Sequence, residues 1–248
     1  MKKPLRLKKN PIVEALFELR FQKKDIPPPE ILPGIFFSEV KNYFKLSRIE
    51  RLIPAIPEDI LDKDENLKYL PQVKIRGERF GILIADSAVS LSYFPPYEGW
   101  DIFKDAISEF LSVLEKQKDA IFSSYLRFSL KYLNLFEEIS EITALKITLR
   151  IGEYDIVNER CSLLAEIPLG SDVLIFNVNS SAKVYLEDLS KAGLLLSLDV
   201  IRFLKEVNSE EVFDFIRESL DELHDKEKDW FFSSLREETL EKLEPEYE

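Results

Sequence analysis

Short stretches of the chain alternate apolar and polar residues, a pattern typical of strands that bury one face. In 13–21, the residues Val13, Ala15, Phe17, Leu19 and Phe21 share one face, and charged residues occupy most of the other. The same period predicts further strands at 72–76, 80–85, 89–94, 127–132, 145–151, 161–167, 173–178 and 193–202. The chain is therefore expected to hold about nine strands.

Three stretches have helical spacing instead. Apolar residues recur at three- and four-residue steps in 35–44, which follows a break at the prolines 27–29, and again for about four turns beyond Gly99. Asn208 with Glu211 forms a capping-box pattern, which predicts that a long helix starts there. Three helices are expected.

This order of elements contains few strand–helix–strand units. It favours an α+β fold of mainly antiparallel sheets with the helices packed on them, rather than a doubly wound parallel sheet. Two similar halves, 1–120 and 121–248, are one interpretation, and a single continuous domain is the other. No internal repeat supports a duplication.

Composition indicates a folded protein with a strongly ionised surface, since 45% of the residues are hydrophobic and 32% are charged. A single cysteine and the absence of a signal-peptide or membrane-spanning pattern predict a cytoplasmic protein that does not enter a membrane. Abundant lysine and glutamate with one methionine and one cysteine are a bias found in proteins of thermophiles.

The net charge of −12 argues against general attraction to nucleic acid. The charge is unevenly distributed, however. Residues 1–24 carry eight basic and two acidic side chains, whereas residues 207–248 carry five basic and fifteen acidic ones. Nucleic acid is therefore expected as a partner only through a local basic patch or through a larger complex.

No familiar catalytic or metal-binding constellation is present. A nucleophile needs a nearby base, and the one histidine, His224, lies in the acidic C-terminal helix, where a structural histidine bonded to a carboxylate is the simpler interpretation. Cys161 is expected in the core. One cysteine with one histidine cannot supply a usual zinc site, and no glycine pattern fits a phosphate loop. We predict no catalytic residue, no metal and no cofactor.

Several residues are candidates for binding instead. Lys8 and Lys9 in the basic start can hold a phosphate backbone, although a solvated terminus is the simpler alternative. Tyr97 and Trp100 can stack on a ligand, although aromatic residues at a strand–helix junction more often close a core. Further candidates on the polar faces of predicted strands are Arg20, Arg127 and Lys131.

Four stretches together carry a resemblance: 10–15 with Pro-Ile-Val-Glu-Ala, 97–100, 130–134, and Leu223-His224 with Trp230-Phe231. The chain resembles a sporadically distributed family of uncharacterised prokaryotic proteins that share this N-terminal motif. It departs from the family pattern at Lys131, where arginine is usual, and at Ser233-Ser234. The resemblance adds Asn134 and His224 to the binding candidates, and the patchy distribution implies a defence-type role.

Two functional hypotheses follow. The first is a non-catalytic binding or assembly protein, an accessory subunit of a prokaryotic defence-type complex, for example an N-terminal-lobe partner of a truncated Argonaute encoded by an adjacent gene. The second is a carboxylate- or metal-dependent hydrolase, phosphoesterase-like, whose site assembles only in three dimensions. The residues favour the first hypothesis and leave self-association open.

Overall fold

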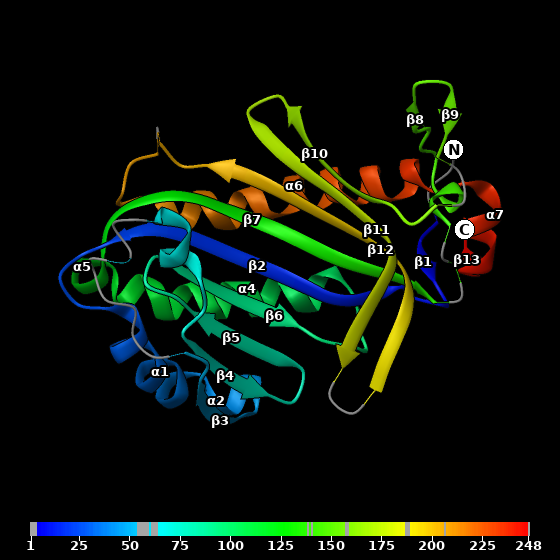
Figure 1. Ribbon diagram of the computed structural model, residues 1–248. Helices are drawn as coiled ribbons and strands as arrows, with labels where there is room; N and C mark the ends of the chain where they lie inside the picture. The colour runs from blue at the N-terminus through cyan, green and yellow to red at the C-terminus, as the bar shows by residue number, and fades with distance from the viewer. Residues whose placement is uncertain are drawn as a thin grey trace. The chain divides into compact units, whose positions relative to one another are not determined.

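The predicted α+β class is confirmed in the computed structural model of the chain (Figure 1). Nine strands form one antiparallel sheet with the order β10-β11-β12-β7-β2-β6-β5-β4-β3. The structure describes residues 4–53, 60, 64–137, 139, 141–156, 159–186, 189–205 and 207–247.

The strands of the sheet match most of the predicted ones. Their bounds are β2 (Ile12–Lys23), β3 (Leu46–Arg51), β4 (Val73–Gly77), β5 (Phe80–Ile84), β6 (Ala88–Tyr93), β7 (Phe122–Glu137), β10 (Ser162–Leu169), β11 (Asp172–Leu186) and β12 (Leu189–Phe203). Two further pairs lie outside it: β1 (Arg6–Leu7) with β13 (Pro245–Glu246), and β8 (Arg150–Ile151) with β9 (Tyr154–Asp155).

Three long helices are present in the described part of the chain, as predicted. They are α1 (Pro28–Glu39), α4 (Trp100–Lys116) and α6 (Val212–Ser234). Shorter helical segments are α2 (Lys41–Phe44), η1 (Glu65–Tyr69), α5 (Lys118–Ile121), η2 (Ile142–Ala144) and α7 (Glu237–Lys242).

The chain divides into two compact units, each built from separate segments. One, here called the meander unit, comprises Ala15–Leu130 and Ile201–Leu223, and the other, here called the hairpin unit, comprises Met1–Glu14, Lys131–Val200 and His224–Glu248. This division differs from the halves 1–120 and 121–248 considered above, because β2, β7, β12 and α6 each contribute residues to both units.

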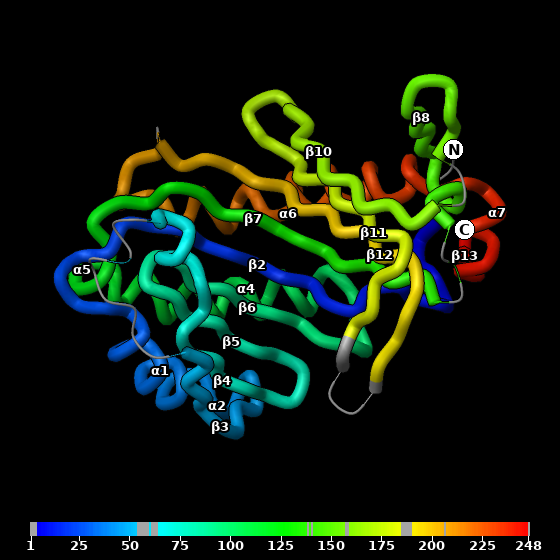
Figure 2. The backbone as a smooth tube through the Cα atoms, viewed as in Figure 1, coloured from blue at the N-terminus to red at the C-terminus, as the bar shows by residue number. Residues whose placement is uncertain are grey.

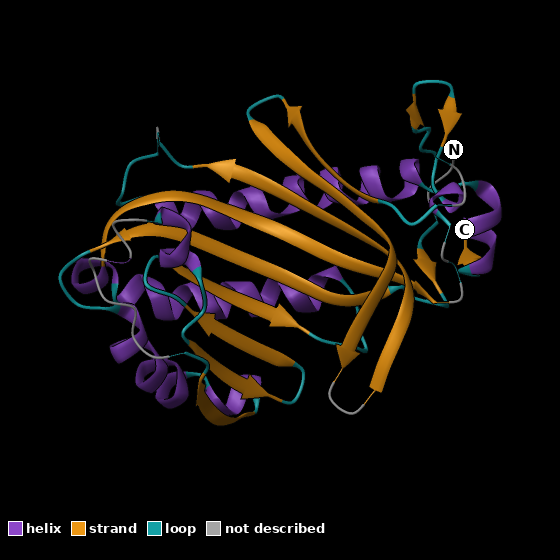
Figure 3. Cartoon of the chain, in the orientation of Figure 1, coloured by secondary structure: helices purple, strands orange, loops and turns teal. Residues whose placement is uncertain are grey.

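The core of the meander unit lies between one sheet face and the helices α1 and α4. Helix α4 lies behind the strands in Figure 3. The ring of Phe110 on α4 stacks on Phe36 of α1 at 5.1 Å between centroids and meets Phe17 of β2 edge-on at 6.1 Å. All three side chains are fully buried. Aromatic packing of this kind adds to the free energy gained by burying their apolar surface.

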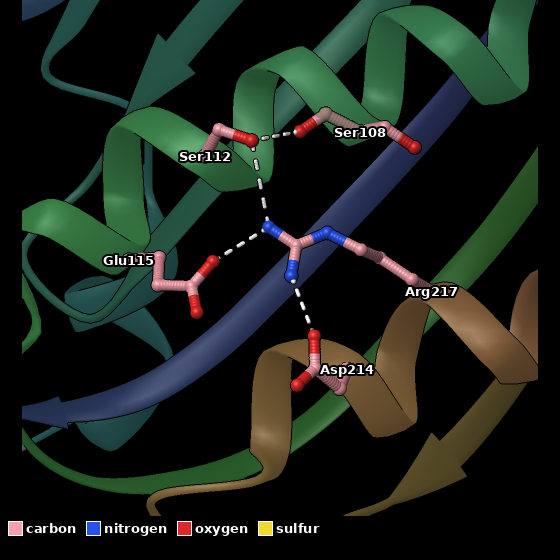
Figure 4. Close-up of polar contacts among 5 residues, drawn as sticks. All are labelled: Ser108, Ser112, Glu115, Asp214 and Arg217. Carbon is pink, nitrogen blue, oxygen red and sulfur yellow. Dashed lines mark hydrogen bonds and ion pairs between the residues drawn. The ribbon is translucent and has the colours of Figure 1, made fainter.

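A polar bridge joins α4 to the first part of α6 within the meander unit (Figure 4). The Arg217 guanidinium donates to Glu115 at 2.6 Å and Ser112 at 3.5 Å on α4, and to Asp214 on its own helix at 3.0 Å. Ser112 in turn donates to the carbonyl of Ser108. Arg217 is partly shielded from solvent, so this bridge fixes the position of the helix start more than it adds stability.

The hairpin unit contains the long pair β10–β11 and both chain ends. Figure 2 shows β1 and β13 side by side, and their pairing joins Arg6 to Glu246 and Leu7 to Pro245. Leu145 and Leu235, both fully buried, form an isolated bridge. Trp230 of α6 meets Phe176 of β11 edge-on at 6.3 Å.

The strand predicted at 145–151 is wrong. Only Arg150–Ile151 is extended in a pair there, and Leu145 ends the short helix η2. Leu145 contacts the C-terminal helices instead, since Arg236 Nε donates to its carbonyl and the backbone of Lys146 donates to Ser234. These long-range contacts decide the structure of the segment in place of its alternating pattern, and a single sequence does not reveal them.

Two helix starts differ from the prediction. The first helix begins at Pro28 rather than near 35, because proline is well tolerated in the first turn, where its missing N–H has no partner to lose. The last begins at Val212, and Asn208 instead accepts a hydrogen bond from the Glu210 backbone in the preceding turn.

Strand β3 was missed because Ser-Arg-Ile-Glu-Arg shows no clear alternation.

A close backbone approach at Gly77 gives a test of the meander unit. A Cβ atom there would collide with the Phe44 carbonyl oxygen and lie 2.8 Å from that of Phe80. We expect Gly77→Ala to lower the free energy of unfolding by about 2 kcal/mol or more. Gly34→Ala, in open space on α1, should raise it by about 0.5–1 kcal/mol. Denaturant midpoints check both, and equal effects would contradict the packing described.

Candidate binding face

The sheet face of the meander unit that points away from Phe110 is rich in charged and hydroxyl side chains. Strand register places Glu18, Ser90, Leu83, Lys74 and Glu50 in one row across five strands. A second row holds Leu16, Ser92, Gly81, Arg76 and Arg48. We call this surface, together with Arg20, Tyr69, Phe94 and Arg127, the polar sheet face.

At one end of the polar sheet face, two guanidinium groups share one carboxylate. Arg20 Nε lies 2.6 Å from Glu18 Oε1, and Arg127 Nη2 lies 3.2 Å from the same oxygen. The side chains of Glu18 and Arg127 are only 17% and 15% exposed, so this contact is partly shielded from water.

The other end repeats this arrangement in a more exposed setting. Glu50 accepts from Arg76 Nε at 2.9 Å and also pairs with Arg48, whose side chain is 62% exposed. The hydrogen bond from Arg76 is the main cause that lowers the pKa of Glu50, and the nearby cations add to it. This second Arg–Glu–Arg trio has two positive charges against one negative charge, an excess of +1.

An aromatic ring and a lysine lie between the two trios. The Phe94 ring packs against Gly81, where a Cβ atom would be 3.0 Å from Phe94 Cε2. Lys74 Nζ lies 5.5 Å from the centre of this ring, which is partly exposed. Ser92, in the row of Gly81, is 1% exposed, and its hydroxyl has no hydrogen-bond partner among the residues that the structure describes.

Tyr69 of η1 holds Arg20 in place. The Arg20 guanidinium lies 4.0 Å from the centre of the Tyr69 ring. Lys68, which precedes Tyr69 on η1, has its Nζ 5.2 Å from the centre of the same ring. A guanidinium that stacks on a ring and bonds one carboxylate is ordered before any ligand arrives. The entropic cost of binding an anion there is therefore reduced.

The outer surface of the helices in the meander unit has the opposite charge. Its exposed acidic residues are Asp101, Asp105 and Glu109 on α4 and Asp214, Glu218, Asp221 and Glu222 on α6. Burial raises the pKa of Tyr43, and the charges of Glu109 and Asp105 add to that rise. An anionic partner is thus repelled by the helix side and attracted to the polar sheet face.

The predicted candidates Arg20 and Arg127 meet on the polar sheet face, and the other candidates lie elsewhere. In the hairpin unit, the Tyr132 hydroxyl is 3.2 Å from His224 Nδ1, the buried Asn134 side chain donates to the Leu196 carbonyl at 3.4 Å, and Lys131 is half-buried. Asn134 therefore anchors neighbouring backbone, as a structural residue does.

Lys8 and Lys9 pair with carboxylates of the chain's last strand and the turn before it. Lys9 Nζ lies 2.8 Å from Glu244, and Lys8 Nζ lies 3.6 Å from Glu246. The pairing lowers the pKa of Glu244, mainly through the hydrogen bond from Lys9. The basic start thus lies against acidic residues of the C-terminus, which offset its charge.

Tyr97 and Trp100 pack against the core at the start of α4. Both rings meet the buried Phe103 edge-on, with centroids 6.4 and 6.3 Å apart, and Tyr97 also contacts Tyr93. Trp100 Nε1 donates to Asp221 at 2.8 Å. These contacts fit the core-closing alternative.

Sequence reasoning missed Arg48, Glu50, Lys74 and Arg76 as members of a site. Their strands were predicted only in part, and the register that aligns Glu50 with Glu18 depends on pairings among five strands. The available signal was the basic residues at alternate positions of 72–76, Lys74 and Arg76, on a predicted one-sided strand.

No protein-family model matches the chain, and a search of curated proteins found no match. The family resemblance therefore stays a prediction. In the part of the chain that the structure describes, no group of three or more histidine, cysteine or acidic side chains is arranged to hold a metal ion. None of the described helices combines the length and apolar character needed to span a membrane.

The two trios should differ in their contribution to stability. Glu18→Gln leaves Arg20 and Arg127 facing each other at low exposure, so we expect the free energy of unfolding to fall by about 2–3 kcal/mol. Glu50→Gln, in the more exposed trio, should lower it much less. Chemical denaturation of both variants checks this, and an equal or reversed order would contradict the burial difference.

Glu227 of α6, one turn after His224, gives a test in the hairpin unit. The residue is 5% exposed, and burial raises its pKa to about 8. The positive charge of Lys228 has a smaller effect that lowers the pKa. The folded state therefore favours the protonated form, and Glu227 makes stability fall as pH rises from 4.5 to about 8, by up to about 1.4 kcal/mol per pH unit.

Glu227→Gln should remove this dependence. We expect the variant to match the parent protein near pH 4.5 and to be more stable at pH 9, as measured by urea unfolding across the range. Glu218→Gln removes the same charge from an exposed position of α6 and serves as the control. Parallel pH profiles for Glu227→Gln and the parent protein would contradict a buried, neutral carboxyl.

Proposed function

We propose that this chain is a non-catalytic binding protein that docks an anionic surface of a partner on the polar sheet face. The observation that carries the proposal is the charge of that face. At its more exposed end, Arg48 and Arg76 share the carboxylate of Glu50, an excess of +1 on a chain whose net charge is −12.

The arrangement of these charges supports binding more than stability. A lone salt bridge would be satisfied by one arginine for each carboxylate, whereas here each carboxylate serves two. In the trio of Glu50, the Arg48 side chain is 62% exposed, and its guanidinium has N–H donors in the fixed fork that suits carboxylate and phosphate groups. An incoming anion would complete the charge balance of that trio.

The partner is proposed to be a protein or a protein–nucleic acid complex encoded near this chain. The family resemblance favours an accessory subunit of a prokaryotic defence-type complex, and an N-terminal-lobe partner of a truncated Argonaute is one concrete form of it. In such a complex, a cationic sheet face would line the path of the nucleic acid. The hydrolase alternative remains a hypothesis.

Co-expression with the products of adjacent genes tests the proposal. We expect the affinity-purified chain to retain a partner, and the double variant Arg48→Glu with Arg76→Glu to lose at least about nine tenths of it, because charge reversal replaces attraction by repulsion. The control, Lys116→Glu with Lys118→Glu, makes the same charge change at exposed pairs with Glu39 and Glu210.

Retention by the Arg48/Arg76 variant at the level of the control would contradict docking on the polar sheet face. Turnover of a phosphoester by the purified chain, abolished by replacing a single carboxylate, would contradict the non-catalytic role and favour the hydrolase. Both variants are first compared with the parent protein by thermal unfolding, so that loss of folding is not mistaken for loss of binding.

A further inference from the structure

We propose that a second copy of this chain pairs with the edge of strand β10 that faces away from β11, so that two copies form a symmetric dimer through one continuous sheet. This inference goes beyond the proposed function, because it concerns the hairpin unit and not the polar sheet face. Three features carry it: the outward-facing backbone groups of β10, the scarcity of charge on that strand, and two opposite charges that become complementary only between copies.

Strand β10 lies at the end of the sheet and pairs only with β11 among the described strands (Figure 1). Its backbone groups alternate between the two edges, because facing residues of an antiparallel pair exchange hydrogen bonds at every second position. The Ser180 N–H donates to the Cys161 carbonyl at 3.0 Å, which assigns the odd-numbered residues to β11. The N–H and C=O groups of Ser162, Leu164 and Glu166 therefore point away from β11.

This edge lacks the charges that keep exposed sheet edges apart. Of the eight residues in β10, only Glu166 is charged, whereas β3, at the other end of the sheet, has three charged residues among six. Leu164 is 62% exposed, and its neighbours on the opposite face, Leu163 and Ala165, are half-buried. A sheet edge with accessible apolar side chains on both faces favours strand pairing with another chain.

Two opposite charges on this edge indicate that the other chain is a second copy. Arg160 and Glu166 are both exposed, and Leu163 lies midway between them in the sequence. Six residues of an extended strand span roughly 20 Å, so these two side chains cannot pair within one chain. In an antiparallel pair of copies with Leu163 on the two-fold axis, Arg160 of each copy lies opposite Glu166 of the other. Symmetry then gives two identical ion pairs.

Pro168 supports this register over the neighbouring one. With Leu164 on the axis, Pro168 would lie opposite Arg160 of the other copy, where its missing N–H removes a hydrogen bond from each end of the interface. With Leu163 on the axis, Pro168 lies beyond the paired residues and Ser162 faces Leu164. Every outward-facing N–H from Arg160 to Glu166 then has a carbonyl opposite it.

Sedimentation velocity on the full chain over about 1–200 μM tests the dimer, because so short an interface is expected to dissociate in the micromolar range. We expect the parent protein to shift from monomer to dimer across this range. Glu166→Arg turns both ion pairs into repulsions and should weaken the dimer at least about tenfold. Arg160→Glu with Glu166→Arg restores opposite charges and should dimerise like the parent protein. Glu153→Arg makes the same charge change at an exposed residue outside β10 and should have no effect.

Two further substitutions test the edge and its register. Leu164→Pro removes an N–H that points away from β11, so it should weaken the dimer while thermal unfolding shows a folded chain. Leu163→Cys in a Cys161→Ser background should form a disulfide between copies under mild oxidation, because the two Cα atoms face each other about 4.5 Å apart. Ile167→Cys in the same background is the control and should not cross-link, since Ile167 lies far from its own copy.

Three outcomes would overturn the inference. The first is a parent protein that stays monomeric over the whole concentration range. The second is a dimer that Glu166→Arg and Leu164→Pro leave unchanged, because another surface then holds it. The third is a monomeric chain that retains a different protein and loses it in Glu166→Arg, which assigns the edge to that partner. The proposed function is tested separately, by retention of the partner in the Arg48/Arg76 variant.

Discussion

The register of β2 against β6 is the constraint on which the meander unit depends. Side chains alternate across a strand, so the pairing of Phe17 with Leu91 directs both to the core and sends Glu18 and Ser90 to the opposite face. A slip by one residue would expose Phe17 and Phe21 and bury two charged residues, Glu18 and Arg20. The aromatic core around Phe110 and the polar sheet face are thus two consequences of one pairing.

The same constraint explains why charge can gather on an acidic chain. The core fixes one face, and the chain is free to place charged residues on the other, provided that each buried charge has a partner. Glu18 pairs with Arg20 and Arg127, and Glu50 pairs with Arg48 and Arg76, so that each carboxylate orders two guanidinium groups. Acidic residues on the outer surface of α4 and α6 then give the meander unit two oppositely charged sides.

Strands and helices could be predicted from periodicity wherever one face is buried, as in β2, β4, β5 and α4. Prediction failed where non-local contacts decide the structure. Leu145 pairs with Leu235 near the C-terminal helices. Strand β3 is a charged edge strand without a clear alternating pattern, and it is identified by its pairing with β4. Of the site residues, Arg20 and Arg127 could be predicted from their place on the polar faces of strands. Their shared carboxylate and the second trio could not be predicted without knowing the order of five strands in the sheet. His224, chosen because it is the one histidine, instead lies beside Tyr132 in the hairpin unit.

Arginine modification mapped by mass spectrometry tests most directly whether the polar sheet face is the interaction surface. The chain would be treated with an arginine-specific reagent with and without a saturating amount of the partner retained on co-expression, and modification would be quantified for Arg48, Arg76 and Arg150, the last an exposed residue of the hairpin unit. We expect protection of Arg48 and Arg76 with no change at Arg150. Equal modification of Arg48 and Arg76 in both samples, at a concentration where the partner is bound, would contradict docking on this face.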